Sequence, residues 1–166
     1  MDFPKTFPAA IIAVLLLSGC TDSNFPPMAD ESAATPESIA QVVSGNNEFA
    51  FELYSKLREK HGNENVLFSP YSISTALAIA HEGAAGTTSE QMLGTLNLPE
   101  DGMARNSSFA SIYNSLNRKG KQYELYTANA LWAQKDYPFS EEYVALVKKY
   151  FGASAQNLDF INEAEK

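Results

Sequence analysis

The residues of this chain that could do chemistry are mostly hydroxyls. Serine, threonine and proline interrupt an otherwise apolar stretch, LFSPYSISTALAIA, at residues 67–80. A serine nucleophile needs a neighbouring base, but His61 and His81 each lie near the predicted end of a helix. We interpret both histidines as solvated or capping residues. No glycine-rich phosphate loop or metal-ligand spacing occurs, so the sequence predicts no catalytic residue, no metal site and no cofactor.

The only cysteine, Cys20, follows an apolar run, AAIIAVLLL, at residues 9–17. A transmembrane helix needs roughly 20 apolar residues, so this shorter run behind Lys5 indicates a secretory signal. The sequence Leu17-Ser18-Gly19-Cys20 resembles the bacterial lipobox, at which the signal peptide is cut and the cysteine thiol is lipidated. The resemblance implies a signal peptide over residues 1–19, lipid attachment at Cys20, and an exported protein that is held at the cell membrane or surface, or is extracellular. An ordinary signal peptide with an incidental cysteine is the alternative.

Composition and charge exclude some partners. Apolar residues make up 45% and charged residues 19% of the 166 residues, as in an ordinary globular domain. The formal net charge of −8 argues against nucleic acid, because phosphate binding needs clustered lysine and arginine. The basic residues at 118–121 and 148–149 are interpreted as solvated faces or helix ends.

The chain is predicted to contain a linker followed by a mixed α and β domain. Residues 20–39 are rich in proline, serine, alanine and acids without apolar periodicity, which is typical of a flexible linker. Residues 40–166 are predicted to be folded. Apolar spacing and helix-capping signals predict helices over residues 46–60, 69–83, 87–98, 102–116 and 140–152. β-rich stretches predict strands over residues 65–68, 123–134 and 153–160.

Local signals explain two of the residues that interrupt the apolar stretch. Ser69 can cap the following helix, and Pro70 suits a first helical turn because its missing donor is not needed there. Ser72 and Thr75 have no such explanation, and burying an unpaired hydroxyl costs about 1–3 kcal/mol. The third helix has two capping-box registers, Thr87 with Glu90 and Thr88 with Gln91, and the residues do not decide between them.

The strand predicted at residues 123–134 carries apolar residues on both faces, which is typical of a strand inside a sheet. One further short strand cannot cover it, and the helix that starts near residue 162 has only five residues. We therefore expect an α+β fold that is the N-terminal part of a larger domain.

The block NVLFSPYSISTALAIAHEGAAGTTSEQM, at residues 65–92, strongly resembles the N-terminal signature of the serpin family. NNEFAFELY, LNLP, TANALWAQKDYPF and YFGASAQNLDF follow the family's order around it, so the resemblance covers residues 46–166. It implies the N-terminal part of the serpin fold: helices A to E, strands of sheet A and one strand of sheet B. The fourth helix has a single basic residue, Arg105, which argues against the heparin activation of some animal serpins.

Serpins are suicide substrates of serine proteases and sometimes of cysteine proteases. The protease cleaves a reactive loop, becomes acylated to it, and is trapped when the loop inserts into sheet A as a new strand. The resemblance therefore implies an endopeptidase inhibitor, not an enzyme. Its expected partners are a target protease and, through Cys20, a membrane, and we expect a monomer. The alternative is a non-inhibitory serpin-fold binding or structural protein at the cell surface.

The resemblance also assigns a candidate site. It places Ser69, Pro70 and Ser72 in the family's shutter, the start of the helix beneath the strands that must part, with Asn65 before it and Thr75 after it. We call residues 65–75 the shutter segment. The reactive loop of serpins lies near the C-terminus, and no residue of this chain is assigned to it.

Overall fold

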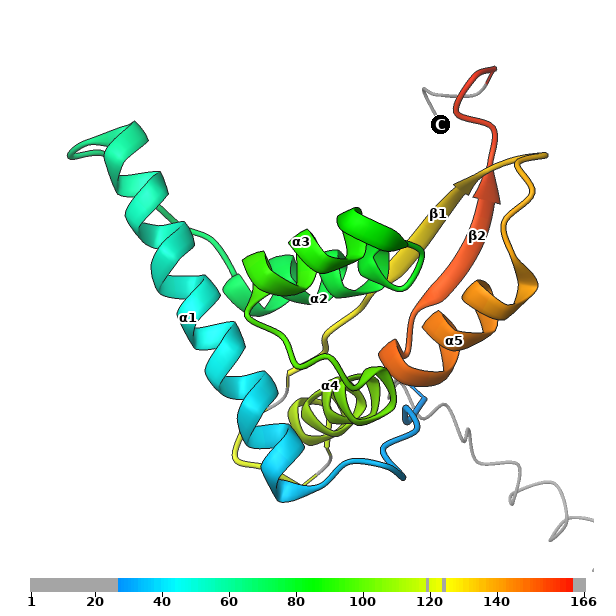
Figure 1. Ribbon diagram of the computed structural model, residues 1–166, viewed down its shortest axis with the longest axis horizontal. Helices are drawn as coiled ribbons and strands as arrows, with labels where there is room; N and C mark the ends of the chain where they lie inside the picture. Colours follow the sequence, from blue (N-terminus) through cyan, green and yellow to red (C-terminus); the bar gives the residue numbers. More distant parts are fainter. Residues whose placement is uncertain (1–26, 119, 124, 163–166) are drawn as a thin grey trace, which may run out of the picture.

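The fold is described by a computed structural model for residues 27–118, 120–123 and 125–162 (Figure 1). Five helices and two strands form in these residues. They are α1 (Pro36–His61), α2 (Pro70–His81), α3 (Gly86–Leu96), α4 (Gly102–Leu116), β1 (Ala130–Gln134), α5 (Glu141–Phe151) and β2 (Ser154–Leu158). Among these described helices, none combines the length and apolar content that crossing a membrane requires.

Helix α1 begins ten residues before the predicted start at residue 46. Thr35 caps it, because the Thr35 side chain accepts a hydrogen bond from the Ser38 amide and the Ser38 hydroxyl accepts one from the Thr35 amide. Pro36 occupies the first turn, where its missing N–H is no loss. Residues 36–39, which the sequence assigned to the linker, are therefore helical. The first part of this helix was missed because Val42 is its only apolar residue before Phe49 that belongs to the core.

Helix α4 is the centre of the described fold, and it packs against both α1 and α5 (Figure 1). Its predicted bounds are confirmed. Phe109 is 2% exposed and its ring lies 5.6 Å from the ring of Phe151 on α5. The other members of this core come from the other four helices, from the α3–α4 connection and from the residue before β2; they are Val42, Phe49, Ala78, Ile79, Leu96, Leu98, Val147 and Ala153.

Strands β1 and β2 pair in parallel, with Ala130 opposite Ser154, and α5 connects them. Such a pair needs a long crossover, which α5 supplies. The long strand predicted for residues 123–134 is wrong in length, because only its last five residues pair. The strand predicted for residues 65–68 does not form, and Leu67 is fully exposed there without a neighbouring strand in the described chain.

The capping boxes predicted for α3 are also wrong. Its N-cap is Ala85, which makes no side-chain hydrogen bond, and the helix starts at Gly86. Gly86 has a φ of 55°, a left-handed conformation that glycine adopts without steric cost. This turn starts the helix early enough that Thr87 and Thr88 already lie inside it.

The segment before α1 is tied to α4 and α5, and we call residues 27–35 the N-terminal strap. The Ala29 amide donates to Asn114 Oδ1 at 2.8 Å, and Asn114 Nδ2 donates to the Ala29 carbonyl at 2.9 Å. Hydrogen bonds from Ser32, followed by the ammonium of Lys149, lower the pKa of Asp30 to about 2. Because the folded pKa lies below the ordinary value of 3.8, this stabilising contribution is present above that pH and is lost as pH falls toward 2.

Candidate functional site: the shutter segment

The first turn of α2 forms as its sequence predicts. Ser69 is the N-cap, with its side chain accepting a hydrogen bond from the Ser72 amide at 3.3 Å, and Pro70 occupies the first helical position. The Ser72 hydroxyl is exposed and lies 2.9 Å from the Ser69 hydroxyl. Ser72 therefore has a local partner, contrary to the expectation of a buried and unpaired hydroxyl.

Thr75 does match that expectation. Its side chain is buried, and Thr75 Oγ1 has no hydrogen-bond partner among the described residues. The buried Tyr71 hydroxyl also lacks a partner in hydrogen-bonding geometry, although it lies near Thr75. Burial raises the pKa of Tyr71, against an opposing effect of the Thr75 hydroxyl. The two buried hydroxyls thus lie near each other on α2 without meeting hydrogen-bonding geometry.

Ser74 is the polar contact that the sequence did not assign. Its hydroxyl donates to Asn46 Oδ1 on α1 and lies 3.2 Å from the Tyr71 carbonyl. Ser74 is 1% exposed, so this bond ties α2 to the middle of α1 inside the protein. The sequence feature that could have predicted this bond is Asn46, a polar residue that interrupts the apolar face of α1.

Asn65 lies apart from this group. It is exposed in the irregular connection between α1 and α2, and no side-chain hydrogen bond joins it to Ser69, Ser72 or Thr75. The described structure therefore brings Ser69, Pro70, Ser72 and Thr75 together on α2 but not Asn65.

A groove of about 310 Å³ runs between α2 and the chain that enters β1. Ser72, Ala76 and Ala80 line one wall, four residues apart on one face of α2. Residues 128–131 line the other wall. Tyr143 of α5 closes the groove, and its hydroxyl donates to the Ile79 carbonyl at 3.1 Å. Burial, with a smaller contribution from Glu82, raises the pKa of Tyr143. The polar first turn of α2 thus lies beside the start of β1.

The end of α2 carries a buried ionic cluster that the sequence did not predict. Arg105 on α4 lies 2.9 Å from Glu82 Oε1, and it also donates to the Pro99 carbonyl at 2.8 Å. His81 lies 3.3 Å from Glu82 and 2.9 Å from the Ser89 hydroxyl. Of the two interpretations of His81, solvated or capping, the first is wrong, because His81 is 6% exposed. The single basic residue predicted on the fourth helix is likewise an internal residue.

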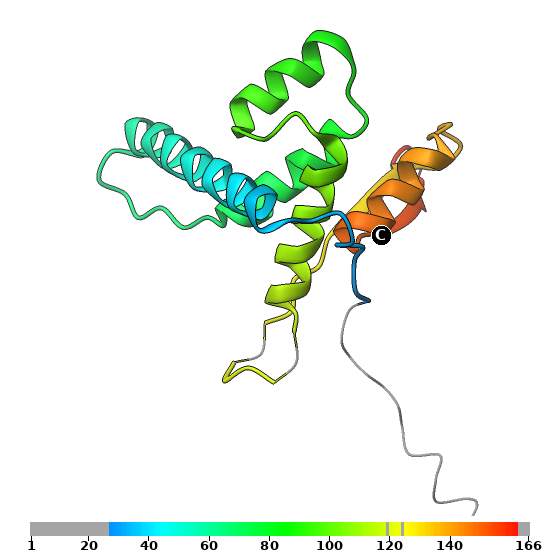
Figure 2. The ribbon, with the colours of Figure 1, turned by 60° about the horizontal axis from the view of Figure 1, so that its bottom comes forward.

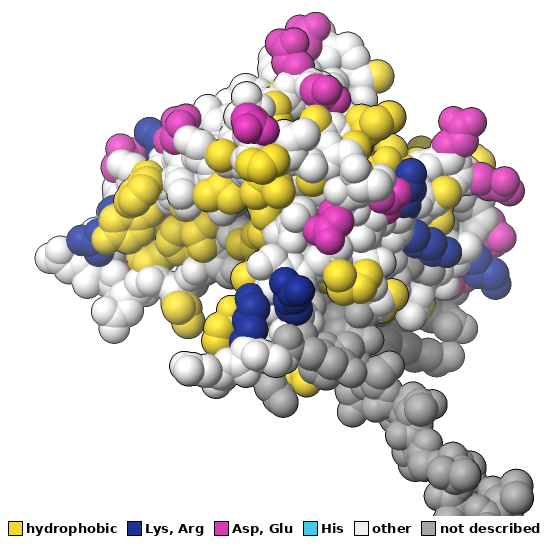
Figure 3. Space-filling view, turned by 90° about the horizontal axis from the view of Figure 1, so that it is seen from below, with side chains coloured by type: hydrophobic (Ala, Val, Ile, Leu, Met, Phe, Trp, Pro, Cys, Tyr) yellow, Lys and Arg dark blue, Asp and Glu magenta, His cyan; other side chains and the backbone are white. Residues whose placement is uncertain are grey.

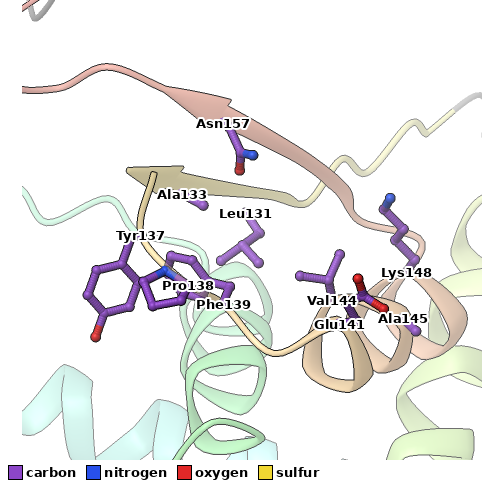
Figure 4. A pocket seen from close by; sticks show the side chains of 10 residues that line it. All are labelled: Leu131, Ala133, Tyr137, Pro138, Phe139, Glu141, Val144, Ala145, Lys148 and Asn157. Atoms are coloured by element: carbon purple, nitrogen blue, oxygen red, sulfur yellow. The ribbon is translucent and has the colours of Figure 1, made fainter. Parts of the chain in front are cut away.

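A second hollow of about 490 Å³ lies between the sheet and α5 (Figure 4). Leu131, Ala133 and Val144 form apolar walls, with Glu141 and Lys148 of α5 among the lining residues. No serine, threonine, cysteine or histidine lines it, so it contains no pair of a hydroxyl or thiol nucleophile with a histidine base. Across the described residues, no group of three or more metal-ligating side chains occurs.

Replacing Thr75 with valine is expected to stabilise the protein by about 1 kcal/mol. Valine has nearly the same shape and removes a buried hydroxyl that lacks a partner. Urea unfolding measures the change. The matched variant Ser74→Ala is expected to cost about 1–3 kcal/mol, because it leaves Asn46 Oδ1 without its donor. A loss of stability in Thr75→Val would show that the hydroxyl is hydrogen-bonded and would contradict this description.

The fold is therefore α+β, with a polar helix start beside the first strand of a parallel pair. The family model for serpins, described as serine protease inhibitors, matches residues 44–166. The chain belongs to the serpin family. This confirms the fold class as a partial serpin fold.

Known relatives agree with this assignment. A serpin-like protein of Methanosarcina mazei is 38% identical over 165 residues, covering 94% of this chain and 39% of that protein. Mouse leukocyte elastase inhibitor A is 37% identical over 129 residues, covering 76% of this chain and 33% of that protein. The structure of human thyroxine-binding globulin with a cleaved reactive loop superposes with a TM-score of 0.68 at 28% identity, covering 76% of this chain and 38% of that one. The chain spans less than two fifths of the length of the curated relatives it matches.

Proposed function

We propose that the complete protein inhibits a serine or cysteine protease as a suicide substrate. In this mechanism the protease cleaves a reactive loop and remains bound to it as an acyl-enzyme. The loop then adds to the sheet that contains β1, which completes backbone hydrogen bonds and buries loop side chains. Family membership over residues 44–166 carries the proposal.

The unpaired hydroxyls of the shutter segment support the proposal that the sheet can adopt two strand arrangements. Thr75 and Tyr71 hold buried hydroxyls without partners on α2, the helix that borders the groove to β1. An unpaired buried hydroxyl disfavours the state in which it occurs, so a rearrangement that supplies a partner recovers that free energy. In the described residues β1 pairs only with β2, which leaves its other edge for further strands of the sheet. We infer that strand movement in the complete protein exchanges these contacts.

A non-inhibitory binding protein is the second candidate. One structural neighbour is a thyroxine-binding globulin, whose name specifies a ligand rather than a protease. The sequence of the loop hinge separates the two candidates. Small residues such as alanine, glycine and threonine favour insertion into the sheet, whereas bulky, charged or proline residues oppose it.

Covalent complex formation tests the inhibitory proposal. The complete protein is expected to form an SDS-stable complex with at least one member of a panel of serine and cysteine proteases. Simple cleavage by every protease in the panel would favour the binding protein instead.

We also propose that Cys20 anchors the protein to a membrane through lipid. Cys20 lies outside the described residues, and the proposal rests on the lipobox-like sequence around it. A single acyl chain binds a membrane only marginally, whereas the several chains of a lipidated N-terminal cysteine hold it firmly. The mature protein would then begin at Cys20 and act at the membrane or cell surface.

A further inference from the structure

The N-terminal strap fixes the place where the chain reaches the domain. Ala29 is 7% exposed and packs with Ala110 and Tyr113 of α4. Both polar atoms of its backbone are bonded to the Asn114 side chain. The next amide, from Asp30, donates to the Lys149 carbonyl at 2.8 Å, and the Asp30 carboxylate lies 3.2 Å from the Lys149 ammonium. The strap is therefore attached to the C-terminal halves of α4 and α5.

The length of chain before the strap limits how far the domain can lie from a lipid anchor. Ala29 lies nine positions after Cys20, with eight residues between them. A fully extended chain of nine residues spans at most about 30 Å, and a flexible one averages about 15–18 Å. With Cys20 anchored as proposed above, on which this inference rests, Ala29 lies within about 30 Å of the membrane.

Helix α4 determines which parts of the domain lie toward that anchor. Figure 2 shows α4 running from the neighbourhood of α3, at the top, to the turn that leads toward β1, at the bottom. The described chain begins on the same lower side (Figure 2). We call residues 117–118, 120–123 and 125–129 the α4–β1 turn. The 15 residues of α4 give it a length of about 22 Å, so the turn and α3 differ substantially in height along this direction.

Charge differs between these two ends. The α4–β1 turn contains two basic residues, Arg118 and Lys121, and no acidic one, a net charge of +2, in a chain whose net charge is −8. Residues 86–101, which include α3 and the residue that caps α4, contain three acidic residues and no basic one, a net charge of −3. In the view of Figure 3 the uppermost charged side chains are acidic, and basic side chains lie side by side below the centre, close to the grey atoms.

Two exposed cations define the basic end. Arg118 and Lys121 are both exposed, and Lys121 Nζ donates to the Ser115 carbonyl at 2.6 Å near the last turn of α4. Cations at the C-terminal end of a helix are favoured by its dipole, which keeps this charge at the end of α4. Anionic headgroups attract lysine and arginine within about a Debye length of their surface.

We propose that the anchored domain takes one preferred orientation on an anionic membrane. The α4–β1 turn faces the phosphate groups of anionic phospholipids, and α3 faces away from them. The short chain from Cys20 brings the turn close to the surface, and the charge difference along α4 selects the orientation.

Energy transfer to lipid headgroups measures this orientation in the complete, lipid-anchored protein. A fluorescent donor is placed through a clickable amino acid at Gln122 in the α4–β1 turn or, as a matched site, at Gln91 on α3; both glutamines are exposed. Vesicles contain phosphatidylglycerol, phosphatidylcholine and an acceptor-labelled headgroup lipid. We expect clearly stronger transfer from position 122 than from position 91. Equal transfer, or stronger transfer from position 91, would overturn the proposal.

Charge reversal distinguishes electrostatic attraction of the turn to anionic lipids from the effect of the short chain that links it to Cys20. The double variant Arg118→Glu/Lys121→Glu is expected to lose most of the difference in energy transfer between positions 122 and 91. The unchanged protein is expected to lose this difference near 1 M salt, where the Debye length falls to about 3 Å. The control Lys56→Glu/Lys60→Glu changes the net charge equally on α1 and should keep the difference. A difference that survives the first variant would contradict the role of the turn.

Membrane fractionation checks the anchor independently. The protein is expected to float with membranes and to become soluble after Cys20→Ser. If the unchanged protein is soluble, both the anchor and the orientation are contradicted. If the protein floats with membranes but the two donor positions show equal transfer, only the proposed orientation is contradicted. Neither result bears on protease inhibition.

Discussion

Replacing Arg105 with methionine is expected to destabilise the complete protein by about 3–5 kcal/mol, because the change leaves a buried carboxylate without its cation. The side chains of Arg105 and Glu82 are 5% and 10% exposed, and they lie 2.9 Å apart. Arg105 also donates to the carbonyls of Pro99 and Glu100, so the change removes donors from the α3–α4 connection as well. Chemical unfolding monitored by circular dichroism measures the loss.

The ion pair of Lys56 and Glu59 provides a matched control. It has a similar separation of 3.2 Å, but its side chains are 77% and 65% exposed. Exposed pairs contribute about 0–1 kcal/mol, so Lys56→Met should change stability little. If Arg105→Met cost no more than Lys56→Met, the buried cluster would not be a main tie between α2 and α4.

Replacing Gly45 with alanine is expected to destabilise the protein by about 2 kcal/mol, although alanine normally favours a helix. Gly45 is buried in the middle of α1, where an added Cβ would overlap the carbonyl oxygen of Asn97. This oxygen belongs to a backbone position that ends α3 in a left-handed conformation, with φ of 52°. Overpacking against a fixed backbone atom therefore outweighs the gain of about 1 kcal/mol in helix propensity.

Gly94 is the matched control for this effect. It also lies inside a helix, α3, but an added Cβ would meet no atom within 4 Å. Gly94→Ala should therefore stabilise the protein by up to about 1 kcal/mol. Thermal unfolding of the two variants is expected to shift in opposite directions. A shift in the same direction would mean that α1 and the end of α3 are not in close contact.

The sequence predicted those elements whose signals are local. Apolar residues at helical spacing gave the bounds of α4, and Ser69 with Pro70 gave the start of α2. Gly152 ends α5 in a left-handed conformation, as a glycine after a helix predicts. In each case the determining residues lie within one or two turns of the feature they determine.

Features that depend on distant residues were missed. The Ser74–Asn46 bond joins positions 28 residues apart, and the Arg105–Glu82 pair joins positions 23 apart. Sequence reasoning assigned Ser72 a buried role from its apolar neighbours, but the side chain points to its own helix cap. The predicted length of β1 was wrong for the same reason, because strand pairing depends on the partner strand rather than on β propensity.

Formation of a covalent complex is the measurement that tests the central proposal most directly. The complete protein is incubated with serine and cysteine proteases and analysed under denaturing conditions. We predict an SDS-stable band that contains both proteins, because loop insertion traps the acyl-enzyme before hydrolysis. A fragment ending at Lys166, which has no residue assigned to the reactive loop, should give no such band and is the control. Cleavage of the complete protein by every protease, without any stable complex, would contradict the inhibitory function.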